Sequence, residues 1–256
     1  MNLVLEGIKY RLHAKKRQGI HSPFVYALAD RALREKIPEK VNSLLKAFDI
    51  EQNLNRQMID FEDFGAGSKR LGKQRSVREI HRFSSSKKYS KLLFRLAHFY
   101  QPQRILELGT SLGRGTLSLH LGHPTAKIFT LEGCHAVAEI AEKNLKQWAI
   151  NATNISVIHA KFHDFLSQSN HQPFDLIYLD GHHDGEALLQ YCSMLEPCMH
   201  ENTLLILDDI RWSASMKRAW ITLLESPIYH VTIDFFRMGL LLKRPMQSKE
   251  HFILRG

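Results

Sequence analysis

The spacing of apolar positions changes near residue 100, and this change separates two kinds of sequence. Before it, "SPFVYALADRALREK" and "SSKKYSKLLFRLAHFY" repeat apolar residues every three or four positions, which predicts amphipathic helices. Ser22 followed by Pro23 is typical of an N-cap with proline at the first helical position, so one helix is expected to begin there. We therefore predict a basic helical extension over residues 1–84 and a separate domain over residues 85–256.

Beyond residue 100, short apolar runs alternate with helix-like stretches. The pattern predicts strands at 104–108, 126–131, 154–159, 174–179 and 203–208, separated by helices near 113–121, 134–148, 162–169 and 184–198, with a further helix near 213–224. Such alternation indicates an α/β fold with a doubly wound, mostly parallel sheet. The last two runs, "YHVTIDFF" and "MGLLLKR", are joined by a short link and are expected to pair as an antiparallel hairpin.

Length and composition fit one α/β domain with an extension, because 256 residues with 44% apolar content can build a sizeable core. Cys134, Cys192 and Cys198 form neither a CxxC pair nor a disulfide framework. No apolar run has the length of a signal peptide or a membrane span. Together these features predict a cytoplasmic protein.

The positive charge is concentrated in the first hundred residues. They hold 21 Lys and Arg against 10 Asp and Glu, whereas residues 101–256 hold 14 against 16. Such asymmetry is typical of contact with nucleic acid, an acidic membrane surface or an anionic substrate, but it also occurs on solvated helical faces. The charge alone leaves these alternatives open.

Two glycine-rich runs compete as a cofactor loop, which must follow a buried strand and open a helix. The run "RILELGTSLGRGTLSL", residues 104–119, meets both conditions. The run "DFGAGS", residues 63–68, follows "LNRQMIDFE", which is not a convincing strand, and precedes a basic segment without an apolar face. We interpret it as a lid or turn in which Gly65 and Gly67 permit bending, or else as an exposed loop. Polar contacts of such a lid would come from Asp60, Glu62 and Asp63.

The chosen loop has the spacing E-x-G-x-x-x-G-x-G, set by Glu107, Gly109, Gly113 and Gly115, which matches the dinucleotide pattern poorly. It resembles motif I of class I S-adenosylmethionine-dependent methyltransferases, in the "ELGTSLG" form of O-methyltransferases, where Ser111 replaces the middle glycine. Glu132 follows the second strand, and an acid there accepts hydrogen bonds from ribose hydroxyls. The sequence therefore predicts an S-adenosylmethionine site.

The resemblance covers about residues 85–245 and implies a seven-stranded, Rossmann-like sheet that ends in the antiparallel hairpin. It also implies the positions of the cofactor contacts. These are Glu107, Gly109, Thr110, Ser111, Gly113, Glu132, Gly133, Phe162 and Asp180.

The residues after the fourth strand bear on the methyl acceptor. "LDGHH" lacks the D/N-P-P-Y/F pattern of enzymes that methylate amino groups of nucleic-acid bases. The leading hypothesis is O-methylation of a small-molecule or sugar-like hydroxyl. The alternatives are an RNA methyltransferase that uses the basic N-terminal region, and a binding module that has kept the cofactor fold without catalysis. The oligomeric state stays open.

Three carboxylates lie at the ends of neighbouring strands: Asp180 at the end of the fourth, and Asp208 and Asp209 at the end of the fifth. Oxygen ligands suit Mg²⁺ or another hard divalent cation, which would bind a hydroxyl and lower its pKa. The positions resemble the metal ligands of catechol-type and macrocin-type O-methyltransferases. In the alternative without metal, Asp180 contacts the cofactor or substrate and Asp208 caps the next helix.

His182, with Asp180, is the candidate catalytic residue. It lies two positions beyond Asp180 on the same loop, and an imidazole can accept a proton at neutral pH. His183 is the competitor, and a substrate hydrogen bond in place of base catalysis is the alternative for His182.

Overall fold

The computed structural model describes residues 3–14, 20–62, 73–83, 87–149, 152–168 and 172–255. The chain divides into two compact units. Unit 1 contains Met1–Arg34 and Leu166–Gly256, and unit 2 contains Glu35–Phe165. This division by contacts assigns residues 1–34 and 35–84 to different units; the predicted boundary at residue 84 stays a prediction.

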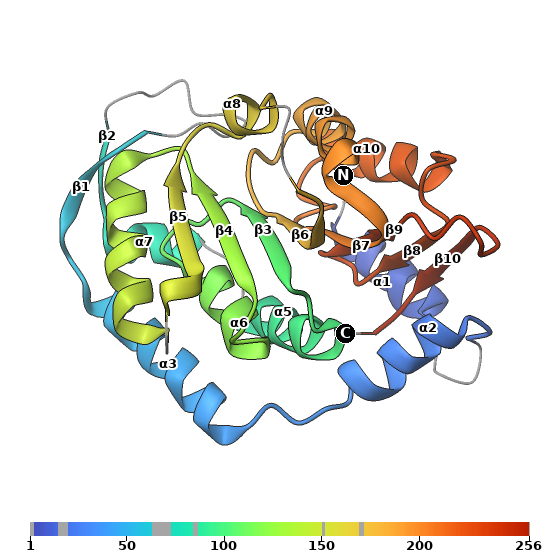
Figure 1. The fold of residues 1–256 in the computed structure, drawn as a ribbon, viewed down its shortest axis with the longest axis horizontal. Helices are drawn as coiled ribbons and strands as arrows, with labels where there is room; N and C mark the ends of the chain where they lie inside the picture. The colour runs from blue at the N-terminus through green and yellow to red at the C-terminus, as the bar shows by residue number, and fades with distance from the viewer. Residues whose placement is uncertain are drawn as a thin grey trace. The chain divides into compact units, whose positions relative to one another are not determined.

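The eight-stranded sheet has the order β10-β8-β9-β7-β6-β3-β4-β5 (Figure 1). Strand β9 is antiparallel to β7 and β8, whereas β3, β4 and β5 pair in parallel, as do β6 with β7 and β8 with β10. The strands are β3 (Arg104–Leu108), β4 (Lys127–Glu132), β5 (Ile155–His159), β6 (Phe174–Leu179), β7 (Met199–Leu207), β8 (Val231–Asp234), β9 (Gly239–Leu242) and β10 (Glu250–Ile253). The predicted mostly parallel α/β sheet and its antiparallel hairpin are confirmed.

The strand count is a correction, because the sequence interpretation implied seven strands and β10 is an eighth. Its sequence, "EHFI", buries only Phe252 fully, so it carries no strong strand pattern. The backbone pairing with β8, in which Phe252 lies opposite Ile233, defines this strand. A long-range pairing of this kind leaves little trace in local sequence.

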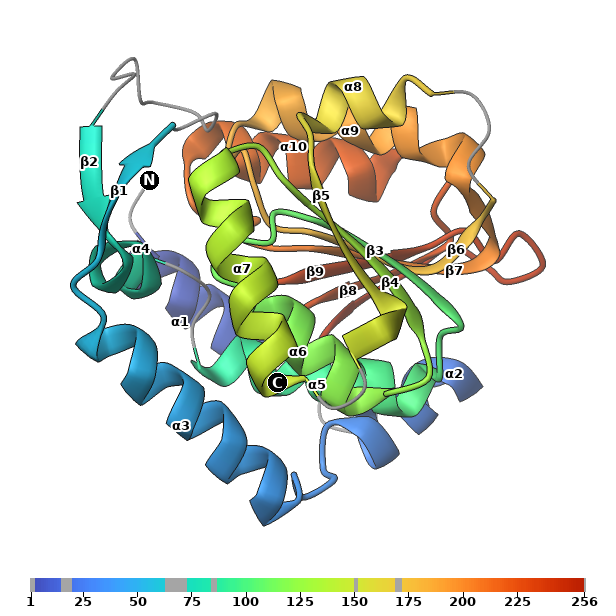
Figure 2. The same ribbon diagram turned by 60° about the vertical axis from the view of Figure 1, so that its left-hand side comes forward.

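Unit 2 contains β3, β4 and β5 together with the helices on either side of them. These are α3 (Glu39–Leu54), α4 (Val77–Phe83), α5 (Lys87–Tyr100), α6 (Arg114–Gly122), α7 (His135–Trp148) and α8 (Phe162–Leu166), of which α8 extends one residue beyond the unit. Helix α3 packs against α4 and α6 (Figure 2). Helix α6 approaches α5 so closely that a Cβ on Gly122 would lie 2.4 Å from the carbonyl oxygen of Phe94.

A second correction concerns the segment before "DFGAGS". Residues Met58–Phe61 form strand β1, which pairs antiparallel with β2 (Lys73–Ser76) beside α7 (Figure 1). Only Ile59 of β1 is buried, so the period-two signal is too short to be recognised in sequence. The "DFGAGS" run, including Asp63, Gly65 and Gly67, lies outside the described residues.

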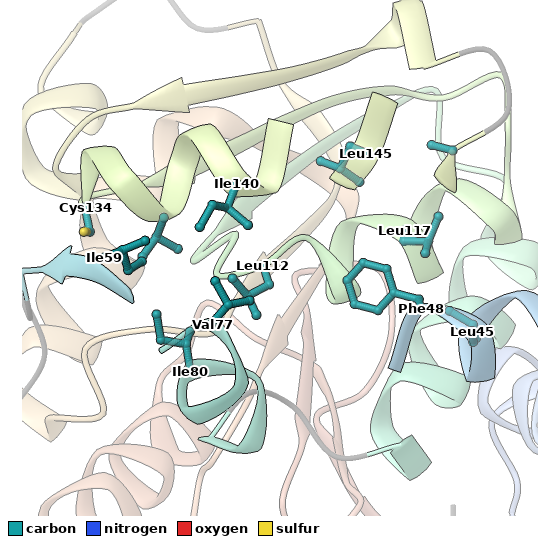
Figure 3. Close-up of a cluster of buried hydrophobic side chains, with 12 residues drawn as sticks. Leu45, Phe48, Ile59, Val77, Ile80, Leu112, Leu117, Cys134, Ile140 and Leu145 are labelled. Carbon is teal, nitrogen blue, oxygen red and sulfur yellow. The ribbon is translucent and has the colours of Figure 1, made fainter. Parts of the chain in front are cut away.

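The core of unit 2 joins these elements beneath the cofactor loop. Leu45 and Phe48 of α3, Val77 and Ile80 of α4, and Leu112 of the loop belong to one cluster of buried side chains (Figure 3). Phe48 is fully buried and lies edge-on to Trp148 at 6.2 Å between ring centroids. The segment before residue 100 therefore contributes directly to the core that supports the loop.

Unit 1 contains β6 to β10 with helices α1 (Leu3–His13), α2 (Pro23–Ala27), α9 (Gly185–Leu195) and α10 (Ala214–Glu225). The predicted cap of α2 is confirmed, because the backbone N–H of Val25 donates to Ser22 Oγ. Glu6 of α1 forms an ion pair with Lys217 of α10 at 2.7 Å. Cys192 and Cys198 are buried and free here, as Cys134 is in unit 2.

Candidate functional site

The loop after β3 is shaped by backbone conformations that suit glycine. Gly109 and Gly113 have φ of 109° and 90°, and Ser111 between them has φ of 47°. The backbone N–H groups of Gly109 and Thr110 both donate to the carbonyl oxygen of Leu131 at 3.0 Å, and the hydroxyl oxygens of Thr110 and Thr130 lie 2.6 Å apart. These bonds fix the loop to the end of β4.

Gly113 also permits a close helix contact. A Cβ at this position would lie 3.1 Å from Cγ of Leu145 on α7. Gly115 is the second residue of α6 and is buried. The glycine spacing found in sequence therefore serves both the turn and the packing of α6 against α7.

Glu107 is fully buried near the end of β3. Its Oε2 accepts hydrogen bonds from the hydroxyls of Thr116 and, at 2.6 Å, Thr130. Its Oε1 is buried and has no hydrogen-bond partner among the described residues. Burial, with a smaller contribution from the nearby charge of Glu132, raises the pKa of Glu107 to about 7. A buried oxygen without a partner is costly, so a donor from a bound ligand would be favourable here.

Glu132 ends β4 and joins two segments of backbone. Its Oε2 accepts from the N–H of Ser111 at 2.9 Å, and its Oε1 accepts from the N–H of Cys134 at 3.0 Å. Burial raises the pKa of Glu132, although these backbone donors oppose that rise. Each carboxylate oxygen keeps a lone pair for a further donor, which is what a ribose diol requires.

Two further predicted cofactor residues, Gly133 and Phe162, lie in the same unit, whereas the third, Asp180, belongs to unit 1. The carbonyl oxygen of Gly133 is 3.0 Å from Nε2 of His159, and Phe162 is the half-buried first residue of α8 after β5. The structure thus brings Glu107, the glycine loop and Glu132 together, while Phe162 stays a predicted contact.

A buried ion pair that sequence analysis missed supports the loop from α3. Both carboxylate oxygens of Asp49 accept from Arg114, the residue after Gly113, at 2.6 and 3.0 Å. Asp49 and Arg114 are each 3% exposed, and Nε2 of His81 lies 3.4 Å from Asp49. The partners lie 65 positions apart in sequence, so no local motif indicates the pair.

A second buried contact fixes the loop from α7. The amide of Asn144 donates to the carbonyl oxygen of Leu112 at 2.9 Å, and Gln52 of α3 donates to Asn144 at 3.3 Å. The cofactor loop is therefore held by side chains from α3, α6 and α7.

The predicted carboxylate cluster is present in unit 1. The Tyr178 hydroxyl lies 2.9 Å from Oδ2 of Asp180 and 3.0 Å from Oδ2 of Asp208. Because a phenol has a single proton, it can donate to only one of these oxygens at a time. Burial, together with the charge of Asp208, raises the pKa of Asp180 well above its ordinary range.

Arg237, which sequence analysis did not identify, is part of this cluster. Its Nε lies 3.2 Å from Oδ1 of Asp208 and 2.5 Å from Oδ1 of Asp209, and its Nη2 donates to Oδ2 of Asp209 at 3.1 Å. Burial, followed by the charge of Asp208, raises the pKa of Asp209 to about 7. The turn between β8 and β9 supplies this arginine, so only the folded hairpin reveals it.

The arrangement does not fit the predicted divalent metal. Arg237 already binds Asp208 and Asp209, and no group of three His, Cys, Asp or Glu side chains suited to a metal ion is found within the described ranges. The carboxylate of Asp208 is also held by the backbone of its loop, because its Oδ1 accepts from the N–H of Asp209 at 2.8 Å. We therefore derive no chemical step through a metal.

The two histidines have different surroundings. Nδ1 of His182 lies 3.3 Å from the hydroxyl of Tyr191, and the backbone of His182 has φ of 57°. Nε2 of His183 lies 3.7 Å from Oδ2 of Asp209, and its ring is 5.6 Å from that of Trp212. His183 is therefore associated with the carboxylate cluster, whereas His182 is oriented by a neutral phenol.

Comparison with known proteins shows what this chain is similar to. Residues 106–210 match the family described as a methyltransferase domain. Solved structures with the same fold include a methyltransferase of Podospora anserina bound to SAH, with a TM-score of 0.59, 14% identity, and coverage of 88% of this chain and 97% of that one. An O-methyltransferase from Bacillus cereus in complex with SAH gives a TM-score of 0.58 at 16% identity, over 91% of this chain and 100% of the other.

A curated relative is similar to this chain in sequence. Catechol O-methyltransferase of Mycobacterium tuberculosis is 29% identical over 133 residues, which cover 52% of this chain and 59% of that protein. The chain resembles the class I S-adenosylmethionine-dependent O-methyltransferases, and the resemblance predicted from its motifs is confirmed. Within the described ranges, no helix combines the length and apolar character needed to cross a bilayer.

Proposed function

We propose that this protein is an S-adenosylmethionine-dependent methyltransferase that transfers a methyl group to a hydroxyl of a small molecule. The observation that carries the proposal is the carboxylate of Glu132, which is fixed by the N–H groups of Ser111 and Cys134 beside the positive-φ loop. The family match over residues 106–210 and the cofactor-bound structures with this fold support it.

The residues of unit 2 fit the cofactor. Glu132 would accept hydrogen bonds from the ribose hydroxyls, and Glu107 would use its unpartnered Oε1 to accept a donor of the ligand. Gly109 and Gly113 give the loop backbone its approach to the ligand. When bound, S-adenosylmethionine supplies an activated methyl group, so the protein has mainly to align the acceptor and remove its proton.

The proposed catalytic residues lie on the loop that follows β6. His182 is proposed as the base that takes the hydroxyl proton, with Tyr191 holding its Nδ1 so that Nε2 is the nitrogen left for the acceptor. Asp180 would contact the cofactor or the acceptor. Small-molecule O-methylation is favoured over RNA methylation because a curated relative is a catechol O-methyltransferase, whereas the basic N-terminal charge favours RNA.

The experiment combines binding and transfer. Calorimetry should show micromolar binding of S-adenosylmethionine or SAH, about −8 kcal/mol, and no binding of NAD. Glu132→Ala should weaken that binding by about 1.5–3 kcal/mol, because hydrogen bonds to a charged group are lost. Glu142→Ala is the matched control, since Glu142 forms an ion pair with the exposed Lys146 on the surface of α7. Binding of NAD in place of S-adenosylmethionine would refute the assignment.

Labelled cofactor then identifies the acceptor class. The purified protein is incubated with methyl-labelled S-adenosylmethionine and separate pools of small hydroxyl compounds and of RNA. Label in the small-molecule pool supports O-methylation of a small molecule. Label in RNA alone, with binding that weakens steeply between low and moderate salt, would establish the RNA alternative instead.

A further inference from the structure

The carboxylates of unit 1 are already engaged within the protein. Asp208 accepts from the N–H of Asp209 through Oδ1 and lies against the Tyr178 hydroxyl through Oδ2. Both oxygens of Asp209 lie against the guanidinium of Arg237. A divalent metal at this place would have to displace the arginine before it could reach these oxygens.

The backbone around Arg237 is fixed as firmly as its side chain. Its carbonyl oxygen accepts from the N–H of Ile210 at 2.9 Å, and the N–H of Phe235 donates to the carbonyl oxygen of Met238 at 2.8 Å. The same turn is held by Arg211, which donates to the carbonyl oxygen of Phe236 at 2.6 Å. Arg237 is thus bound to the loop after β7 at two points, one through its backbone and one through its side chain.

We propose that Arg237 is a built-in cation that replaces a divalent metal at the carboxylate cluster, and that the cluster operates free of metal. Arginine suits the position because its planar guanidinium is always charged and presents parallel N–H donors to a carboxylate. Mg²⁺ requires a nearly octahedral shell of oxygens at short distances, which oxygens bound to a guanidinium do not supply. The inference rests on the proposed function and deepens it, because it identifies the positive charge that faces the carboxylates of Asp208 and Asp209.

Arg237 is accordingly a positioning residue. It pairs with both Asp208 and Asp209 and so sets the position of the loop that also carries Ile210 and Arg211. Metal binding by a variant without Arg237 distinguishes a purely structural role from the role of a metal substitute. If Arg237 takes the place of a metal, its removal should turn the carboxylate cluster into a metal site.

The test uses Mn²⁺ alone as the probe, because the loss of the free-ion signal in electron paramagnetic resonance measures its binding directly. Wild type should show no stoichiometric Mn²⁺ site. Arg237→Ala should bind Mn²⁺ at least about tenfold more tightly than wild type, because the carboxylates lose their competing cation. Arg237→Lys, which keeps the charge, should behave like wild type. Arg237→Gln replaces Arg237→Ala if the latter fails to fold, with the same expected result.

A further variant locates the site. Adding Asp209→Asn to Arg237→Ala should abolish the acquired Mn²⁺ binding. The proposal is overturned if wild type binds Mn²⁺ stoichiometrically and loses it in Asp209→Asn, or if removal of the arginine creates no Mn²⁺ site. Calorimetry with SAH on the same proteins keeps the two proposals apart. SAH binding by wild type tests the cofactor assignment, and the Mn²⁺ result tests only the role of Arg237.

Discussion

The buried pair of Asp49 and Arg114 gives the sharpest stability prediction. Asp49→Ala would leave the Arg114 guanidinium in a site where only 3% of the residue is exposed, without the two carboxylate oxygens that accept from it at 2.6 and 3.0 Å. Removing one member of a buried ion pair costs about 3–5 kcal/mol, because the other charge stays buried and uncompensated. His81, at 3.4 Å from Asp49, would lose the same acceptor.

The assay is thermal unfolding of the purified protein, followed by circular dichroism. For a chain of this size, 1 kcal/mol shifts the midpoint by about 2–4 °C, so Asp49→Ala should unfold at least about 6 °C lower than wild type. Glu142→Ala is the matched control, because its carboxylate lies 2.7 Å from Lys146 but the two side chains are 55% and 71% exposed. An exposed pair of this kind contributes about 0.5 kcal/mol or less.

The pair also predicts an effect on ligand binding. Arg114 follows Gly113 directly at the start of α6, so its displacement should loosen the loop and weaken SAH binding in Asp49→Ala while Glu142→Ala leaves it unchanged. Equal unfolding midpoints for Asp49→Ala and Glu142→Ala would refute the reasoning. It would mean that water reaches Arg114 readily and that the pair contributes no more than a surface contact.

Two further predictions concern the same loop. Burial raises the pKa of Glu107 from 4.5 to about 7 in the folded protein, so its contribution to stability is full below pH 4.5 and is lost as the pH rises through 7. The stability lost over this pH range is about 3 kcal/mol, and Glu107→Gln should show no such pH-dependent loss. Parallel pH profiles of the unfolding midpoint for wild type and Glu107→Gln would contradict this prediction. Gly113→Ala places a Cβ at φ 90° and 3.1 Å from Leu145, so it should destabilise by about 1–2 kcal/mol. Gly7 lies on helix α1, where an added Cβ would be 3.7 Å from the nearest atom, so Gly7→Ala should instead stabilise the protein by about 0.5–1 kcal/mol. Unfolding midpoints that shift in the same direction for both glycine variants would count against the argument.

The parts of the fold that were predicted correctly are those whose signals lie in consecutive residues of the sequence. The run in which β3 ends at Leu108 and continues into Gly109 combines a mostly buried strand, a turn and a helix start, and each leaves a local signal. Glu132 was found because it ends the next strand at the expected spacing. By contrast, β1 and β10 are four residues long and bury few side chains, so their pairing partners define them more than their own sequences do.

The missed side chains share a different property, since each acts on a residue far away in the chain. Asp49 binds a residue 65 positions later, and Arg237 reaches Asp208 across 29 positions. Sequence reasoning recognised that neighbouring carboxylates repel one another unless a cation or a proton intervenes, and it proposed a divalent metal, with metal-free roles for Asp180 and Asp208 as the alternative. The hairpin turn brings the basic residue, and that step depends on tertiary structure.

The last prediction separates the two candidate bases. His182 is held through Nδ1 by the Tyr191 hydroxyl at 3.3 Å, whereas His183 lies 3.7 Å from an oxygen of Asp209. With the acceptor identified by the labelled-cofactor screen, His182→Ala should lower the turnover rate by about 10²–10⁴, as expected for removal of a general base. SAH affinity should stay unchanged, because the cofactor contacts are assigned to other residues.

His183→Ala is the matched control and should cost far less, since its ring is directed to a carboxylate that already pairs with Arg237. Tyr191→Phe should give an intermediate loss, because it keeps the imidazole but removes the hydroxyl that orients it. Raising the pH should restore part of the activity of His182→Ala, because an acceptor that ionises in solution needs the base less. Wild-type turnover in His182→Ala, or equal losses in the two histidine variants, would mean that neither imidazole removes the proton. Alignment of the hydroxyl with the methyl group would then have to account for the rate.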